Sequence, residues 1–221
     1  LYDYYLYDFY GVDPDTGASL YQEWEADEDG NTSPVFDEAG NPVLTEKASS
    51  TEKGYIGGSA LPDLYGSITN SFSYKNFRLD VMMTYGIGGK IYDGAYRSLM
   101  TEGDYGEALH VDLLDGWRNP GDATDIPRME FGNTDLAYGT TDRWLTDASY
   151  LTFKNVNLSY TFGKDLTQRM GVKALKIFVV GENLYMFSAR KGMNPQESFA
   201  GTTSNVYLPQ RTVSVGVNLS F

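Results

Sequence analysis

Hydrophobic and polar residues alternate with a period of two in several stretches of the chain. In 77–87, Phe77, Leu79 and Val81 share one face, opposite Arg78 and other polar or small residues. Successive side chains of a β-strand point to opposite faces, so this pattern predicts a strand with one apolar and one wet surface. The same alternation occupies three further stretches: 64–74, 155–162 and 212–221.

Three other stretches carry a weaker strand pattern. In 174–188, Leu175, Ile177 and Val179 share a face, while residues 1–10 are aromatic on both faces. We predict strands there and at 18–25. Taken together, 64–74, 77–88, 149–162, 174–188 and 211–221 are expected to be antiparallel neighbours in sequence order.

The predicted strands are joined by links that alternate between short and long. Bacterial outer-membrane barrels have short periplasmic turns and long outer loops. We therefore predict an all-β fold, an antiparallel transmembrane β-barrel segment of about seven strands with long extracellular loops. The C-terminus then lies on the periplasmic side. The short links are 11–17, 75–76 and 163–173, and the long ones are 26–63, 89–148 and 189–210.

The composition suits this interpretation without deciding it. The chain has 18 Tyr, 24 Gly and 11 Phe, and its mean hydropathy is −0.38. No run of about 18 apolar residues could span a bilayer as a helix. A secreted β-sandwich would have a similar composition, so a soluble, secreted β-rich glycan-binding or adhesion module remains the alternative.

Charge and residue usage exclude several classes of function. There is no Cys and a single His, His110, so thiolate sites and His-based catalysis are not expected. The net charge of −13 argues against nucleic acid as a partner. The excess of acid is uneven, because 149–221 has only Asp165, Glu182 and Glu197 as acids against eight Lys or Arg.

Two pairs of carboxylates have the residue types for glycoside hydrolysis, which needs two acids about 5–10 Å apart. Asp112 and Asp115 stand at helical spacing, and Asp122 and Asp125 flank a stretch rich in Gly and Pro. Nothing in the sequence marks either pair as buried. We expect solvated loop positions and no enzymatic activity.

One acidic motif resembles the start of a calcium loop. Asp27, Asp29 and Asn31 offer oxygen ligands at alternate positions, and Glu38 stands at the twelfth position of the loop. The flanks look like a β-turn ribbon and lack helical character. We therefore expect no metal and no cofactor, with calcium near these residues as the alternative.

The long loops carry aromatic and Arg side chains, which are enriched at interfaces. The alternative for the two Trp residues is that they anchor a small core of the loop itself. The stretch 105–117 could form a short amphipathic helix in which Leu109, Leu113 and Leu114 pack. The candidates for a surface that faces a substrate or partner are Tyr96, Trp117, Arg118, Tyr138 and Trp144.

The chain ends in an alternating strand whose last residue is Phe221. Such an ending resembles the terminal strand of outer-membrane proteins, in which the final aromatic residue belongs to the signal read by the barrel-assembly machinery. The alternative is a strand that merely ends on Phe.

Five motifs follow one another along almost the whole chain. They are Tyr10 to Gly17, Gly57 to Gly66, Phe72 to Phe77 with Tyr85 to Gly89, Thr141 to Val156, and Gly181 to Phe187 followed by Gly192 to Glu197. As an ordered set they resemble the C-terminal third of the SusC-like (starch-utilisation type) TonB-dependent transporters.

This resemblance implies a 22-stranded barrel filled by an N-terminal plug. We expect 1–221 to be the C-terminal portion, with the plug and the N-terminal strands absent, because an open sheet leaves unpaired edges in lipid. The implied function is TonB-dependent import of an oligosaccharide or peptide across the bacterial outer membrane. The implied partners are a SusD-like surface lipoprotein, the N-terminal remainder, TonB acting through that remainder, and outer-membrane lipid.

Overall fold

The computed structural model describes residues 2–130, 132, 139–198, 200–204 and 206–221. The chain forms two compact units. The first unit comprises Leu1–Ala60, Lys90–Thr146 and Phe199–Asn205, and the second comprises Leu61–Gly89, Asp147–Ser198 and Val206–Phe221.

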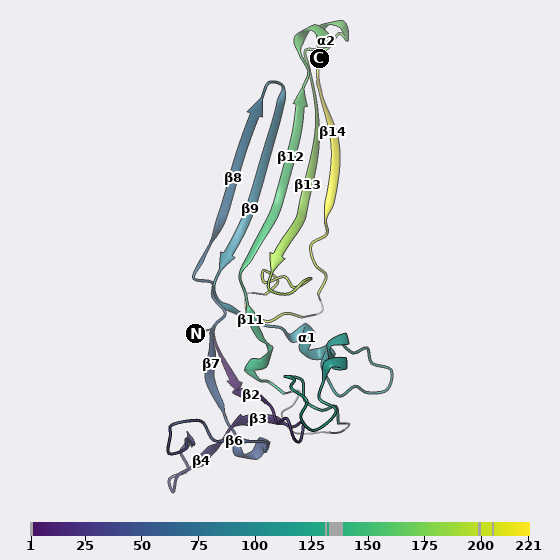
Figure 1. Cartoon of the computed structure of the whole chain (residues 1–221). Coiled ribbons are helices and arrows are strands. Elements are labelled where there is room, and N and C mark those ends of the chain that lie inside the picture. Colours follow the sequence, from purple (N-terminus) through teal and green to yellow (C-terminus); the bar gives the residue numbers. More distant parts are fainter. Residues whose placement is uncertain (1, 131, 133–138, 199, 205) are drawn as a thin grey trace. The chain divides into compact units, whose positions relative to one another are not determined.

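The second unit is built on one five-stranded antiparallel sheet in the order β14-β13-β12-β9-β8. The β8–β9 turn and the link that contains helix α2 (Lys164–Arg169) lie at the same end of this sheet (Figure 1). The predicted order of neighbours, with both short links on one rim, is confirmed. The strands are β8 (Leu64–Tyr74), β9 (Phe77–Ile87), β12 (Tyr150–Thr161), β13 (Ala174–Ser188) and β14 (Thr212–Ser220).

The register aligns the apolar positions of neighbouring strands on one face. Leu158 is paired with Leu79 and with Val179, and Val179 is paired with Val215. Leu158 is 47% exposed and Val215 76% exposed. In the part of the chain that the structure describes, no second sheet covers this face. The opposite face carries mostly polar side chains, including Ser, Thr and Asn together with the charged Arg78, Asp80 and Glu182, and we call the two surfaces the apolar face and the polar face.

A bulge interrupts the otherwise regular pairing of β12. Its register with both neighbours shifts between Phe153 and Asn155. Against β9, Lys154 is an extra residue of β12, whereas in the pairing with β13 the two residues Asn183 and Leu184 stand opposite Lys154. Opposite the bulge, Asn183 of β13 has a positive φ of 50°, a conformation that Asn tolerates better than most residues. This irregular segment forms one wall of the pocket described below.

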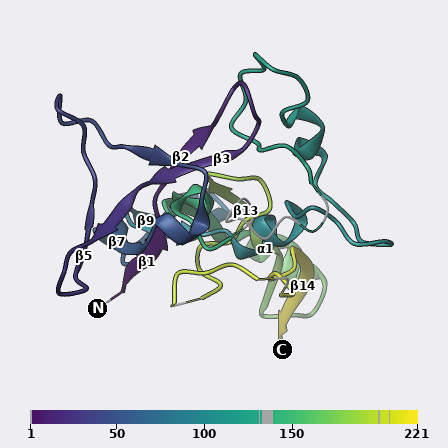
Figure 2. The ribbon, with the colours of Figure 1, turned by 90° about the horizontal axis from the view of Figure 1, so that it is seen from below.

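The first unit consists of short strands in small sheets (Figure 2 shows β2 and β3 side by side). Residues 1–10 do not form one strand but break at Asp8, because the part before it pairs with β7 and the part after it with β3. The predicted 18–25 strand breaks at Glu23. The pairs and triplets are β1 (Asp3–Tyr7) with β7 (Lys53–Ser59); β2 (Phe9–Val12), β3 (Ser19–Gln22) and β6 (Leu44–Thr45); β4 (Trp24–Ala26) with β5 (Thr32–Pro34); and β10 (Lys90–Tyr92) with β11 (Leu145–Asp147).

These pairings correct the count of about seven strands in one sheet. Among the described residues, the main sheet has five strands, and the two N-terminal segments pair inside the first unit.

The core of the first unit is made by residues that are distant in sequence. Its buried side chains are Leu6, Tyr92, Met100, Ile126 and Trp144. The unit's helical segments are short, and in the described part of the chain no helix has the length and apolarity needed to cross a membrane. The described helical segments of this unit are η1 (Ala48–Ser50), α1 (Gly94–Leu99), η2 (Val111–Asp115) and η4 (Asp142–Trp144).

The expected helix across 105–117 is therefore wrong except for its last turns. Only η2 forms. Leu113 packs against the core, but Leu114 is 65% exposed, so the predicted packing of all three leucines does not hold.

Candidate functional site

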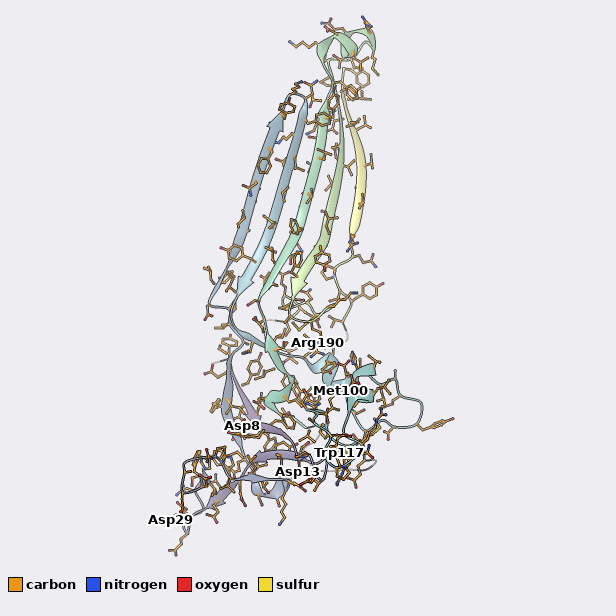
Figure 3. The ribbon with its side chains drawn as sticks, in the orientation of Figure 1. Asp8, Asp13, Asp29, Met100, Trp117 and Arg190 are labelled. Carbon is orange, nitrogen blue, oxygen red and sulfur yellow. The ribbon has the colours of Figure 1, made fainter. Side chains whose placement is uncertain are left out.

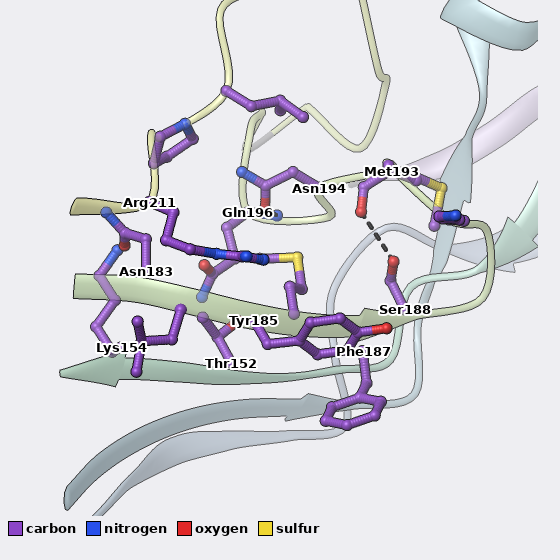
Figure 4. A pocket seen from close by; sticks show the side chains of 16 residues that line it. Thr152, Lys154, Asn183, Tyr185, Phe187, Ser188, Met193, Asn194, Gln196 and Arg211 are labelled. Carbon is purple, nitrogen blue, oxygen red and sulfur yellow. Dashed lines mark hydrogen bonds between the residues drawn. The ribbon is translucent and has the colours of Figure 1, made fainter. Parts of the chain in front are cut away.

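A pocket of about 580 Å³ opens on the second unit, at the end of the sheet opposite α2. Its floor is the start of β12 and the end of β13, including Thr152, Lys154 and Asn183. Loop residues 191–196 and 208–211 form the rest of its wall (Figure 4). Thr152 is paired with Thr84 and Met186, which places the pocket on the polar face.

Hydrogen bonds hold the loop walls against the strands. The Ser188 hydroxyl donates to the carbonyl oxygen of Met193 at 2.8 Å (Figure 4). The Asn194 side-chain oxygen accepts from the backbone N–H of Gln196 at 3.1 Å. On the other side, Asn183 donates its side-chain amide to the carbonyl oxygen of Gln210 at 3.2 Å. These hydrogen bonds fix the two loop segments that form the walls of the pocket.

The charges that line this pocket are all positive. Lys154, Lys191 and Arg211 contribute to it, and no Asp or Glu does. None of the three cations forms a salt bridge with any described residue. The chain as a whole has a net charge of −13, so a pocket lined by three cations and by no Asp or Glu differs in sign from the rest of the molecule.

A buried hydroxyl also faces the pocket. Thr152 is only 3% exposed, and its hydroxyl oxygen has no hydrogen-bond partner among the described residues. A buried polar group without a partner is unusual and costs free energy. Thr152 is one of the residues that line the pocket.

The predicted loop residues Trp144 and Tyr96 lie in or against the core of the first unit. Trp144 is 2% exposed, and its ring N–H donates to the carbonyl oxygen of Gly139 at 2.9 Å. The Tyr96 ring stands edge-on to it, with centroids 6.0 Å apart, and its hydroxyl donates to Asp112 at 2.7 Å. Their positions support the alternative that these aromatics anchor the loop's own core, because a buried Trp144 presents no surface to a partner.

Trp117 packs against another segment of the same unit. Its ring lies against Gly17, where an added Cβ would come within 2.4 Å of the indole, and its ring N–H donates to Pro14 at 2.9 Å. Figure 3 shows Trp117 beside Asp13 of this turn. Arg118 is exposed, whereas Tyr138 lies outside the described residues.

Three apolar side chains of the same loop project into solvent. Tyr105 is fully exposed, and Val111 and Leu114 are well exposed. The sequence signal was present in the 105–117 segment, but a helical interpretation assigned its leucines to packing.

The suggested calcium ligands form a hydrogen-bonded turn. Asp27 accepts from the backbone N–H groups of Asp29 at 3.0 Å and Asn31 at 2.8 Å, and the side-chain amide of Asn31, with these backbone bonds, lowers the pKa of Asp27. Asp29 lies at the tip of this hairpin (Figure 3). The turn at Asp37 repeats the arrangement. Among the described residues, no three His, Cys, Asp or Glu side chains gather as a metal site.

Two carboxylates of the first unit lie close to each other. Burial raises the pKa of Asp142, and the nearby charge of Asp8 raises it further. The backbone N–H of Phe9 donates to Asp142 at 2.9 Å. Burial likewise raises the pKa of Asp8. The hydrogen bond from Phe9 to Asp142 ties β2 to η4.

Phe221 follows β14 and is exposed. It continues the alternation that places Val213, Val215, Val217 and Leu219 on the apolar face.

No family model matches the chain. In sequence it is similar to three TonB-dependent receptors of Formosa agariphila: P39, with 27% identity over 74% of this chain; P3, with 25% identity over 78%; and P26, with 25% identity over 93%. The chain spans only about a fifth of the length of these relatives, 17%, 18% and 22% respectively.

The fold is similar to that of solved transporters. A structure of the RagAB peptide transporter superimposes with a TM-score of 0.81 at 23% identity, over 99% of this chain and 23% of that one. The RagAB peptide importer in its "closed-closed" state gives 0.80 at 22% identity, over 99% of this chain and 23% of that one. The resemblance to a fragment of the SusC-like TonB-dependent transporters, stated above from the motifs, is confirmed.

Proposed function

We propose that this chain is the C-terminal part of an outer-membrane transporter that imports a nutrient oligomer, a peptide or an oligosaccharide, in a TonB-dependent manner. The observation that carries the proposal is the exposed apolar face of the five-stranded sheet. No step of the transport changes the substrate chemically, so the protein is not an enzyme.

The apolar face requires an apolar surrounding. Leaving one large aliphatic or aromatic side chain in water forgoes about 1.5–3 kcal/mol of burial free energy. Here the exposed positions include Leu64, Phe72, Leu158, Val215 and Leu219. A bilayer removes all of them from water at once, as a barrel wall requires.

Further strands are needed to complete the barrel. Strands β8 and β14 each pair on one side only among the described residues, and unpaired strand edges are not tolerated in lipid. In the proposed protein, the N-terminal remainder supplies the missing strands of a 22-stranded barrel, the plug and the segment that contacts TonB. The chain's small share of its relatives' length agrees with this proposal.

The proposed surface partner is a SusD-like lipoprotein. The solvent-facing side chains of Tyr105, Val111 and Leu114 offer apolar anchors for it, and the exposed Arg118 offers a charged rim. Replacing Tyr105 and Leu114 with Ser should reduce co-purification of the lipoprotein, whereas the exposed Ser98→Ala should not. If co-purification is also unchanged after the Tyr105 and Leu114 substitutions, this surface does not bind the lipoprotein.

Cellular uptake tests the central proposal. Deleting the complete transporter should abolish growth on, or uptake of, its nutrient, and deleting TonB should have the same effect while leaving the protein in the outer membrane. A soluble, secreted β-rich binding module would instead fractionate away from membranes, and TonB would not affect it. Recovery of the native protein in the soluble fraction would overturn the proposal.

Phe221 is the proposed barrel-assembly signal, with the C-terminus on the periplasmic side. Its deletion should lower the amount of folded protein in the outer membrane without changing its synthesis. Burial of one aromatic side chain contributes only about 1.5–3 kcal/mol, so a large loss would indicate recognition during assembly. Unchanged surface levels would assign Phe221 to strand packing alone.

A further inference from the structure

The positively lined pocket is a ligand site whose chemistry is more specific than general import. We propose that it binds a carboxylate of the transported ligand, so that the transporter selects acidic oligomers. This inference rests on the proposed import function and adds a substrate class to it.

The cations converge on the pocket from separate parts of the second unit. Lys154 lies at the bulge, where it is an extra residue of β12 relative to β9, Lys191 comes from the loop after β13, and Arg211 immediately precedes β14. Lys154 and Arg211 both lie on the side of β13 that faces Asn194 and Gln196 (Figure 4). The planar guanidinium of Arg211 can donate two parallel hydrogen bonds to one carboxylate.

Neutral donors complete the polar lining. The buried hydroxyl of Thr152 has no described partner, and the side-chain amides of Asn183, Asn194 and Gln196 border the same space. Because no Asp or Glu lines the pocket and none of its three cations is in a salt bridge with a described residue, its lining favours an anionic group.

The size and the remaining lining fit part of an oligomer. A volume of about 580 Å³ is within the range of sites that hold small molecules, roughly 300–1,000 Å³. Leu184, Met186, Met193 and Leu208 add apolar surface for the uncharged part of a residue that bears the carboxylate. The pocket thus fits one acidic residue of a peptide or one uronic acid of an oligosaccharide.

Binding to the purified complete transporter tests the inference. The probes are a Glu-containing hexapeptide with its Gln-substituted counterpart, and an oligogalacturonate with its neutral galactose counterpart. Calorimetry gives the affinity of each for the native protein and for Lys154→Gln and Arg211→Gln. The matched control is Lys176→Gln, which removes a lysine of β13 that does not line the pocket.

We expect at least one acidic probe to bind more tightly than its neutral counterpart. Each pocket substitution should weaken that probe about tenfold or more, because a hydrogen bond to a charged group is lost. The neutral probe and the control variant should change by less than about twofold. Whichever acidic probe responds identifies the source of the carboxylate.

The inference is overturned if neither acidic probe is preferred, or if the pocket substitutions weaken acidic and neutral probes equally. TonB-dependent uptake of a neutral ligand would then leave the import function intact without this selectivity. Should either strand-side variant fail to give a heat-modifiable folded barrel, Lys191→Gln, at an exposed loop position, provides the same comparison without altering a strand.

Discussion

The two units of this chain treat their apolar residues in opposite ways. The first unit gathers Leu6, Tyr92 and Trp144, from three distant parts of the sequence, into a buried cluster. The second unit aligns Leu79, Leu158 and other apolar positions along one face of a sheet and leaves that face uncovered by described residues. The first unit therefore has the organisation of a water-soluble structure, whereas the second needs an apolar medium on one side.

A polar mean composition can therefore conceal a membrane-facing surface. Alternation divides each strand between two environments, so the average over the chain is uninformative. The position of each apolar residue relative to its neighbours decides which environment it meets.

Removing the central side chain of the first unit should have the largest effect on stability and should stay within that unit. Trp144→Ala deletes a 2% exposed indole, and such deletions cost about 3–5 kcal/mol. Hydrogen exchange should show lost protection in β1, β10 and η4, with β9 and β12 unchanged. Equal loss of protection in both units would show that they fold as one and would break the comparison.

A charge on either face of the sheet should distinguish the two environments. Val215→Arg places a cation on the apolar face, where it should cost about 2–4 kcal/mol near the middle of a bilayer. The neighbouring Ser214→Arg, on the polar face, should cost far less. Urea titration of the complete barrel in lipid vesicles measures both, and similar costs would refute the assignment of faces.

Two substitutions in the first unit should change its stability at pH 7 in opposite directions, by smaller amounts. Burial, with the charge of Asp8 adding to it, raises the pKa of Asp142. The folded state therefore holds this proton more tightly than the unfolded state, and the resulting stabilisation is lost as pH rises through the raised pKa. Asp142→Asn, which keeps the side-chain oxygen as an acceptor for Phe9, should match the native protein at low pH and be more stable at pH 7.

Asp122→Asn is the matched control. The backbone N–H groups of Asn119 and Arg118 lower the pKa of Asp122, so its ionised form stabilises the fold above the unfolded pKa and this stabilisation is lost as pH falls. The substitution should therefore destabilise the first unit at pH 7. Thermal unfolding at both pH values checks the pair, and a change of the same sign in both variants would contradict the assignment.

The main sheet could be predicted from the sequence because its signal is local. In each strand, apolar and polar residues alternate with a period of two. The turn at Lys75 and Asn76 fixes the register of β8 against β9. Residues 1–10 have aromatic side chains on both faces, so no alternation distinguishes a buried face from an exposed one. Their division between two sheets depends on the distant partners β7 and β3.

The pocket could not be predicted because tertiary structure assembles it. The excess of Lys and Arg in 149–221 was visible, but a bulge at Lys154 and the packing of the 190–196 loop onto Ser188 decide which cations converge. In the same way, the sequence leaves Trp117 open between a partner-facing position and a core anchor, because its contact, Gly17, is remote in sequence.

The accessibility of successive positions on β14 tests the central claim most directly. Spin labels at 213 to 219, one per variant of the complete protein in lipid vesicles, report collisions with apolar oxygen and with a polar nickel chelate. We expect high oxygen accessibility at Val213, Val215, Val217 and Leu219, and low oxygen accessibility at Ser214, Gly216 and Asn218. Uniform accessibility to the nickel chelate along the strand, with no alternation, would contradict a lipid-facing sheet.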